Sequence, residues 1–205
     1  MKHVRIASLA TAALVGLVAA GPAFADTQTT GTNAVSPTLQ VSATVTKAIR
    51  LTLASGTGCT VAAGSDYSMN FGTVDALGIT AASCGQKFAP TTPGSTPAVY
   101  YSDYKLKPVF TSQSTTNNNI TAYVSTDFAS AAGLLSIVHA NSAPSAIADL
   151  SAMGKALGSA TTVATNATNT AEITRWVGVS VAPLNGAGTL TGNDSATITY
   201  TLTVN

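Results

Sequence analysis

Apolar and polar residues alternate one by one along much of this chain. Between residues 196 and 204, every even position holds an apolar residue or tyrosine, and every odd position holds threonine. Because successive side chains of a β-strand point to opposite faces, this pattern predicts a strand with one buried face. That face would carry Ile198, Tyr200, Leu202 and Val204.

Other stretches show the same period of two. Residues 39–45 place Leu39, Val41, Ala43 and Val45 on one face. The remaining stretches are residues 49–53, 104–110, 120–124 and 173–181. Pro108, inside residues 104–110, predicts an edge strand or a bulge, because proline lacks the N–H that a central strand donates.

Turn-forming residues separate the predicted strands. Prolines, glycines and asparagines gather in residues 89–97, 112–119 and 183–193. Many short strands joined by turns predict an all-β fold, an antiparallel immunoglobulin-like β-sandwich. We expect a single domain over residues 38–205, preceded by a flexible polar segment over residues 26–37.

One segment has helical spacing instead. After a proline, apolar side chains recur at Ile147, Leu150, Met153 and Leu157. Residues three or four apart lie on the same face of a helix, and proline is common in its first turn. We expect a short helical insert, an amphipathic helix over residues 144–157 that covers one end of the sandwich.

The first 25 residues have the layout of a secretory signal peptide. A basic start with Lys2 and Arg5 precedes an apolar run, and residues 23–25 form an Ala-x-Ala cleavage site. A membrane anchor would need roughly 20 continuous apolar residues, and this run is shorter. We expect cleavage before Asp26, with no transmembrane segment afterwards. The mature chain would then reside in the periplasm, at the cell surface or outside the cell.

The chain has two cysteines, Cys59 and Cys84, which lie 25 positions apart. Exported compartments are oxidising, and paired cysteines there usually form a disulfide. A zinc ion would need four ligands, or three plus water, but the mature chain has one histidine, His139, and no C-x-x-C motif. A lone catalytic thiol would not need a second cysteine. We therefore expect a disulfide, which would stabilise the fold by about 3–4 kcal/mol in the chain-entropy model.

Charge is scarce. Charged residues make up 8% of the chain, whereas roughly 25% is usual in soluble proteins. Without Lys2 and Arg5, seven basic residues remain against eight acidic ones. This balance provides no basic patch for nucleic acid and no polybasic segment for a membrane surface.

The sequence contains no recognisable catalytic motif. A nucleophile needs a neighbouring base, and a lone histidine beside apolar residues, such as His139, is more often structural. Glycoside hydrolysis needs two carboxyl groups about 5–10 Å apart, but Glu172 is the only glutamate and the aspartates are scattered. Phosphate-binding and zinc-protease motifs are missing from the sequence. We expect no enzyme activity, no cofactor and no metal site.

Aromatic residues suggest an alternative function. Tyr100, Tyr101, Tyr104 and Trp176 could form a platform on which a sugar stacks, or they could fill the core or an interface. We favour the core for Trp176 and take the Tyr100–Tyr101 pair as the best candidate for an exposed ligand contact. The alternative function is a secreted carbohydrate-binding or adhesive module without catalytic activity.

Two phrases of the sequence resemble the opening of the spore coat protein U family. Residues 39–48 read LQVSATVTKA, and residues 59–78 read CTVAAGSDYSMNFGTVDALG. The family pattern is an alternating strand, a cysteine followed by an apolar residue, and a short strand ending in a Phe-Gly turn and an acidic residue. The matching positions are Cys59, Phe71, Gly72, Asp75 and Cys84. The alternating terminal strand also fits this family.

The resemblance implies a secreted fold related to the subunits of chaperone–usher pili. In such subunits the sandwich is incomplete, and a strand from a neighbour fills the gap. Residues 39–45 would make a good donor strand, but the interpretation favoured by the sequence alone is that they are the domain's own first strand. Residues 26–37 contain few apolar residues and would make a poor donor.

We therefore expect an exported structural or surface protein, a subunit of a pilus-like or coat-like extracellular assembly. Its partners would be further copies of itself or other surface subunits, and a periplasmic chaperone is another candidate partner. The candidate assembly residues are the apolar positions of residues 39–45 and of the terminal strand.

Overall fold

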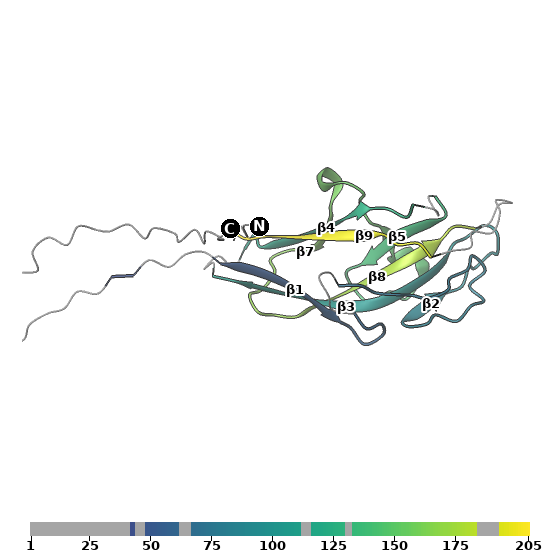
Figure 1. Ribbon diagram of the computed structural model, residues 1–205, viewed down its shortest axis with the longest axis horizontal. Helices are drawn as coiled ribbons and strands as arrows, with labels where there is room; N and C mark the ends of the chain where they lie inside the picture. Colours follow the sequence, from purple (N-terminus) through teal and green to yellow (C-terminus); the bar gives the residue numbers. More distant parts are fainter. Residues whose placement is uncertain (1–41, 44–47, 62–66, 112–115, 130–132, 184–192) are drawn as a thin grey trace, which may run out of the picture. The chain divides into compact units, whose positions relative to one another are not determined.

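The structure is a computed structural model, which describes residues 42–43, 48–61, 67–111, 116–129, 133–183 and 193–205 (Figure 1). The chain divides into two units, Met1–Val45 and Thr46–Asn205. Of the first unit only Ser42 and Ala43 are described, and both are exposed and lie in no strand. All the strands described below belong to the second unit.

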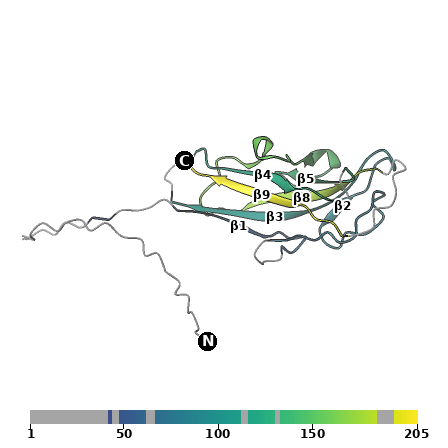
Figure 2. The ribbon, with the colours of Figure 1, turned by 45° about the horizontal axis from the view of Figure 1, so that its top comes forward.

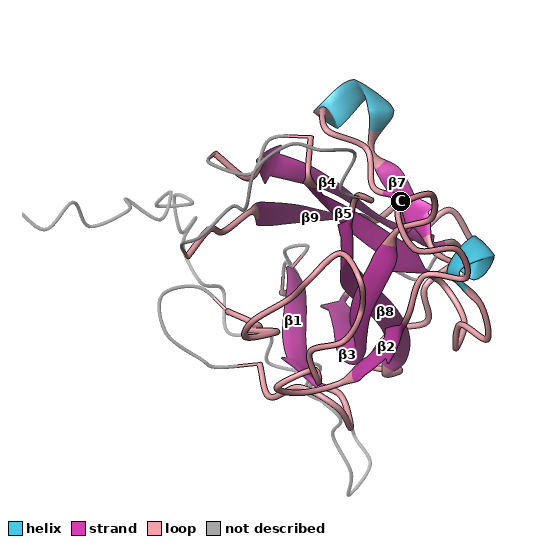
Figure 3. Cartoon of the chain, turned by 90° about the vertical axis from the view of Figure 1, so that its right-hand side faces the viewer, coloured by secondary structure: helices cyan, strands magenta, loops and turns pink. Residues whose placement is uncertain are grey.

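The second unit consists of two antiparallel sheets that pack against each other (Figure 3). The larger sheet has six strands in the order β1-β3-β8-β5-β6, with β2 also paired to β3, and the smaller has three in the order β7-β4-β9. The strands are β1 Ile49–Ser55, β2 Gln86–Phe88, β3 Ala98–Phe110, β4 Asn119–Thr126, β5 Leu135–Ala140, β6 Ser151–Ala152, β7 Thr161–Ala164, β8 Ile173–Val181 and β9 Thr197–Thr203. The predicted all-β sandwich is confirmed.

The main core lies between the two sheets. Leu106 of β3, Ile120 of β4 and Val163 of β7 are each 0% exposed and belong to one apolar cluster. In β9, which lies beside β4 (Figure 2), the predicted alternation holds. Its even positions pack against this cluster, and most of its threonines are exposed. The period of two therefore identified the inward face of β9.

Pro108 lies where β3 has a strand neighbour on one side only, so the predicted edge position holds at this residue. β3 pairs with β1 on one side and with β8 on the other. Pairing with β8 ends at Leu106, so Pro108 has a strand partner on the β1 side only, where it lies opposite Leu51. Its carbonyl accepts a hydrogen bond from the Thr170 N–H at 2.8 Å. The missing N–H therefore interrupts no ladder between β3 and β8.

The predicted helix over residues 144–157 is wrong. The segment contains the 3-10 turn η1 Ile147–Asp149, then the strand β6, and a second 3-10 turn, η2 Leu157–Ser159, begins at its end. The Asp149 carboxylate accepts hydrogen bonds from the N–H groups of Ser145 and Ala146 at 2.7 and 2.9 Å. These bonds close a tight turn where the α-helix was expected.

The helical spacing was misleading because its apolar residues face different surroundings. Leu150 packs in a cluster with Val99 and Tyr101 on the outer face of the larger sheet, whereas Met153 belongs to the core between the sheets. Leu157 is 67% exposed. The segment therefore covers the outer face of a sheet instead of one end of the sandwich.

Candidate functional site

Each sheet ends in a strand with one unpaired edge. β1 is the last strand of the larger sheet and β9 the last strand of the smaller one, and no described strand pairs with the outer edge of either. Figure 3 shows the two strands on the same side of the sandwich. An unpaired edge presents free N–H and C=O groups, which makes it a template for a further strand.

An open groove of about 690 Å³ lies between these two edges. Its lining comes from β1, β3, β8 and β9 and from the segment that follows β1. The apolar and aromatic side chains that define it include Leu51, Leu53, Tyr104, Val177, Ile198 and Tyr200. The groove is thus a largely apolar channel flanked by two strand edges.

Side chains that line the groove are less buried than those deeper in the sandwich. Leu51 and Leu53 of β1 and Ile198 of β9 are half-buried, although all three face the core cluster. Leu106 of β3, the next strand inward from β1, is 0% exposed. Apolar surface left in water is unfavourable by about 25 cal/mol per Å². Covering the groove would therefore complete the burial of both edge strands.

Two tyrosines meet within the groove. The ring centroids of Tyr104 and Tyr200 are 5.8 Å apart at an interplanar angle of 61°, an edge-to-face arrangement. Burial raises the pKa of Tyr104 to about 12 and raises the pKa of Tyr200 well above its usual value. The hydroxyl of Tyr104 is buried, and that of Tyr200 interacts with it. The tyrosine pair therefore forms part of the groove lining.

The predicted assembly residues of the terminal strand lie along the groove and beyond it. Ile198 and Tyr200 line it, Leu202 packs against the core further along β9, and Val204 follows the end of that strand. Of the predicted donor positions, Ala43 is exposed and in no strand. The others, Leu39, Val41 and Val45, lie outside the described residues.

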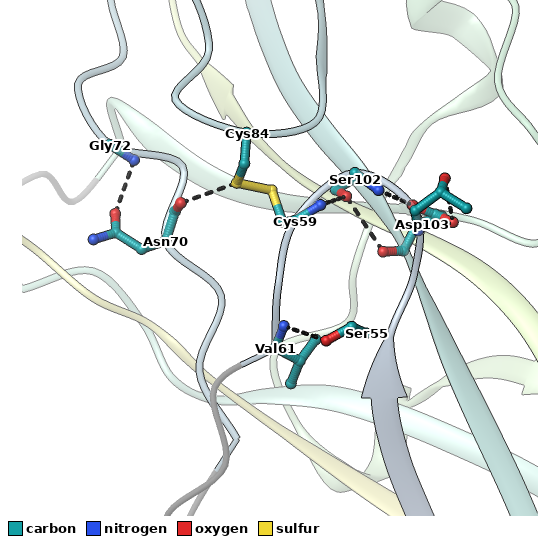
Figure 4. The surroundings of a disulfide bond; sticks show 10 residues. Ser55, Cys59, Val61, Asn70, Gly72, Cys84, Ser102 and Asp103 are labelled. Carbon is teal, nitrogen blue, oxygen red and sulfur yellow. Dashed lines mark hydrogen bonds between the residues drawn. A yellow bond between two sulfur atoms is a disulfide. The ribbon is translucent and has the colours of Figure 1, made fainter.

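The structure contains the predicted disulfide between Cys59 and Cys84, whose Cα atoms are 4.9 Å apart. It joins the turn after β1 to the segment that leads into β2 (Figure 4). The Cys59 N–H donates a hydrogen bond to Ser102 Oγ at 2.8 Å. Next to it, the Asp103 carboxylate accepts hydrogen bonds from the N–H groups of residues 57–58 at 2.7 and 2.9 Å. β3 therefore anchors the turn that carries the disulfide.

The acidic residue of the Phe-Gly motif holds a turn together. The Asp75 carboxylate accepts hydrogen bonds from the N–H groups of Leu77, Ile79 and Thr80 at 2.8, 3.1 and 2.6 Å. It also accepts one from the Tyr100 hydroxyl at 3.0 Å. Burial acts to raise the pKa of Asp75, but these hydrogen bonds outweigh it and hold the pKa well below its usual value.

A lysine holds the same turn through its carbonyls. Lys87 Nζ donates to the carbonyl oxygens of Gly78, Ile79 and Thr80 at 2.5, 3.1 and 2.8 Å. Gly78 has a φ of +63°, and a Cβ there would lie 2.9 Å from Ala89 Cα. The pattern of residues 71–78 is therefore structural in this chain, with Asp75 capping a turn.

The tyrosine pair is not exposed, so that expectation is wrong. Tyr100 is 0% exposed and Tyr101 is 4% exposed. They point to opposite faces of β3, and apolar residues cover both faces at this point. Trp176 is half-buried on the outer face of the larger sheet, where it packs against the cluster of Leu150 and Tyr101, and not in the core between the sheets.

His139 lies at a buried position of β5, where it is 4% exposed. Burial lowers its pKa, which keeps the imidazole neutral at pH 7, and its Nε2 has no hydrogen-bond partner among the described residues. No nucleophile in the described part of the chain is therefore hydrogen-bonded to this nitrogen. Among the described residues, no three His, Cys, Asp or Glu side chains gather where they could hold a metal ion.

Comparisons with known proteins find no match: no protein-family model, no curated protein and no solved structure resembles this chain to a significant degree. Within the described part of the chain, no helix is both long and apolar enough to cross a membrane. The resemblance to the spore coat protein U family stays a prediction from the sequence.

Proposed function

We propose that this protein is an exported structural subunit that assembles by strand exchange. In this proposal, residues 39–45 of one copy occupy the groove between β1 and β9 of the next copy. The observation that carries it is the groove itself, an apolar channel bordered by two unpaired strand edges. Each edge can pair with the backbone of an inserted strand.

The lengths of the three segments agree. β1 and β9 have seven residues each, and the alternating segment from Leu39 to Val45 also has seven. An inserted strand of this length could pair with both edges along their full extent. It would join the two sheets on the side where they are now separate.

The chemistry of the segment suits the groove. Its inward positions would be Leu39, Val41, Ala43 and Val45, which match an apolar lining. Burying a valine or leucine side chain contributes about 1.5–3 kcal/mol. Four inward residues would thus add several kcal/mol, in addition to the backbone ladder.

The connection to the rest of the chain favours an extended assembly. Three residues, 46–48, separate the segment from β1. A subunit that donates its strand to one neighbour still has its own groove open for another. Such a head-to-tail contact need not close on itself, so it produces filaments. The predicted signal peptide and the resemblance to spore coat and pilus subunits support the same proposal.

Electron microscopy of the purified mature chain tests this proposal. We expect filaments or a ladder of oligomers from the wild type. Val41→Asp should prevent assembly, because an unpaired charge in the groove costs several kcal/mol. The matched control Ser42→Asp places the same charge on the outward face and should assemble like the wild type.

The alternative is that residues 39–45 fill the groove of their own chain. Val41→Asp would then unfold the monomer instead of producing a folded one that does not assemble. Circular dichroism and size-exclusion chromatography of both variants separate these outcomes. A folded Val41→Asp variant that still forms wild-type oligomers would rule out strand exchange through this segment.

A further inference from the structure

A second pocket, of about 300 Å³, opens on the outer face of the larger sheet. It shares no lining residue with the groove between β1 and β9. Tyr101 and Asp103 of β3 line it, and they alternate along that strand with Tyr104 and Leu106, which face the core between the sheets. The pocket therefore lies on the opposite side of the sheet from the core.

Two aromatic side chains line this pocket. Tyr101 lies opposite Gly178 of β8, where an added Cβ would come within 2.8 Å of the tyrosine Cβ, so the glycine leaves room for it. Phe88 stacks on the tyrosine ring with centroids 4.8 Å apart and an interplanar angle of 20°. Trp176 is half-buried, and its indole N–H makes no hydrogen bond to any described residue. The pocket thus combines the fixed ring of Tyr101 with the partly exposed ring of Trp176.

Polar groups stand beside these rings. The Gln86 Oε1 atom accepts a hydrogen bond from the Tyr101 hydroxyl at 2.8 Å, which fixes the amide and leaves its NH₂ without a partner among the described residues. Gln86 is exposed, and Asp103 is half-buried. Burial acts to raise the pKa of Asp103, but the hydrogen bonds from Thr57 and Gly58 lower it, so the carboxylate is ionised. The site therefore offers both N–H donors and an acidic group.

The disulfide fixes the walls of this pocket. Gly58 and Gly85, the neighbours of Cys59 and Cys84, both line it. A Cβ on Gly58 would lie 3.0 Å from the Gly85 Cα, so the two turns are in close contact. Gly85 has a φ of +73°, and a Cβ there would lie 2.4 Å from the carbonyl oxygen of Tyr101. The pocket is thus a rigid feature that does not depend on the groove.

We propose that this pocket binds a single ring of a neutral carbohydrate. A sugar ring has an apolar face for Trp176 and hydroxyl groups that accept from the Gln86 amide. The Asp103 carboxylate is already bonded to Thr57 and Gly58 and contributes negative charge to the pocket. The carboxylate disfavours an anion, and the polar groups disfavour a purely apolar ligand. The volume lies at the small end of the range for ligand sites. The subunit would then carry a glycan-binding site in addition to the groove.

The test uses the fluorescence of Trp176, the only tryptophan in the chain, so the signal comes from the pocket. The mature protein is titrated with the methyl glycosides of glucose, galactose, mannose and N-acetylglucosamine. We expect a saturable change with at least one of them. Gln86→Leu removes the exposed amide and should weaken that binding about three- to tenfold, the value of one hydrogen bond.

Two controls make the result specific. Lys107→Leu makes an exposed polar position of β3 apolar outside the pocket, and this variant should bind the glycoside like the wild type. Gln86→Leu should assemble normally, whereas Val41→Asp should bind the sugar normally, so the two proposals can fail separately. The proposal is overturned if no glycoside gives a saturable change, or if folded Gln86→Leu protein binds as tightly as the wild type.

Discussion

Replacing Asp75 by asparagine should destabilise the fold, because both carboxylate oxygens are used. Oδ1 accepts from the N–H groups of Leu77 and Ile79, and Oδ2 accepts from Thr80 and the Tyr100 hydroxyl. Asparagine has the same shape, but one oxygen becomes an NH₂ group. In either orientation of the amide, this group faces at least one backbone N–H, so a donor opposes a donor.

The size of the effect follows from these contacts. A hydrogen bond to a charged group contributes about 1.5–3 kcal/mol, and at least one such bond is lost. We expect Asp75→Asn to lower the free energy of unfolding by about 2–3 kcal/mol. For a domain of this size that corresponds to a fall in the melting temperature of about 4–12 °C. Urea denaturation followed by circular dichroism measures the change directly.

The pH dependence provides a second signature. The pKa of Asp75 is held well below its usual value, so its contribution is fully present above the unfolded-state pKa of about 3.9. That contribution is lost as the pH falls further toward the folded-state pKa. The difference in stability between the wild type and Asp75→Asn should therefore be largest near neutral pH and should shrink below about pH 4.

The matched control is Glu172→Gln, which removes an exposed ion pair with Lys105 at 3.1 Å. Its effect should be within about 1 kcal/mol, as is usual for surface pairs. The reasoning fails if Asp75→Asn costs no more than this control. It also fails if the difference from the wild type does not change between neutral pH and acid.

Two further predictions concern the disulfide and the histidine. The native protein should show no free thiol in mass spectrometry without reduction, and the double substitution Cys59→Ala, Cys84→Ala should lower the unfolding free energy in urea by about 3–4 kcal/mol. His139→Ala should leave assembly unchanged in electron microscopy. Because burial lowers the pKa of this histidine, the unfolding free energy of the wild type should fall as the pH drops below about 6.5. In urea denaturation, His139→Ala should lack this pH-dependent loss. An equal loss in the variant would contradict the assignment of His139 as a buried neutral residue.

A strand with one covered face shows its alternation in the sequence, and a strand with both faces covered need not show it. β9 and β4 show a clear alternation because one face lies on the core. β5 was missed because Ile137, Val138, His139 and Ala140 are all buried in succession. The segment around η1 covers the outer face of β5, so the sequence of β5 shows no alternation of apolar and polar residues.

The same cause explains the error over the tyrosine pair. The first five residues of β3, from Ala98 to Ser102, are all buried. Their adjacent aromatic rings therefore point into two separate apolar clusters, although adjacent tyrosines suggested an exposed contact. The number of aromatics in the sequence does not reveal how many faces of a strand are covered.

The sequence indicated strand exchange as one possible mode of assembly, but it did not locate the groove. The sequence identified the alternating strands and the candidate donor, but the unpaired edges arise from pairing between distant segments. β1 pairs with β3 and β9 pairs with β4, and both pairings leave an edge free. The sequence named Tyr101 and Trp176 as part of a possible sugar platform, but it did not predict the second pocket, because the pocket's residues come from β2, β3, β8 and two loops.

A mixing experiment tests the central claim, that a strand of one copy fills the groove of another. Val41→Asp disables the donor segment, and Ile198→Glu places a charge in the groove, where the side chain lines the open channel. Each variant alone should be a folded monomer in size-exclusion chromatography with light scattering. Mixed together, they should form a one-to-one dimer and nothing larger, because one groove and one donor segment remain. Two separate monomers in the mixture, or oligomers from either variant alone, would contradict the proposal.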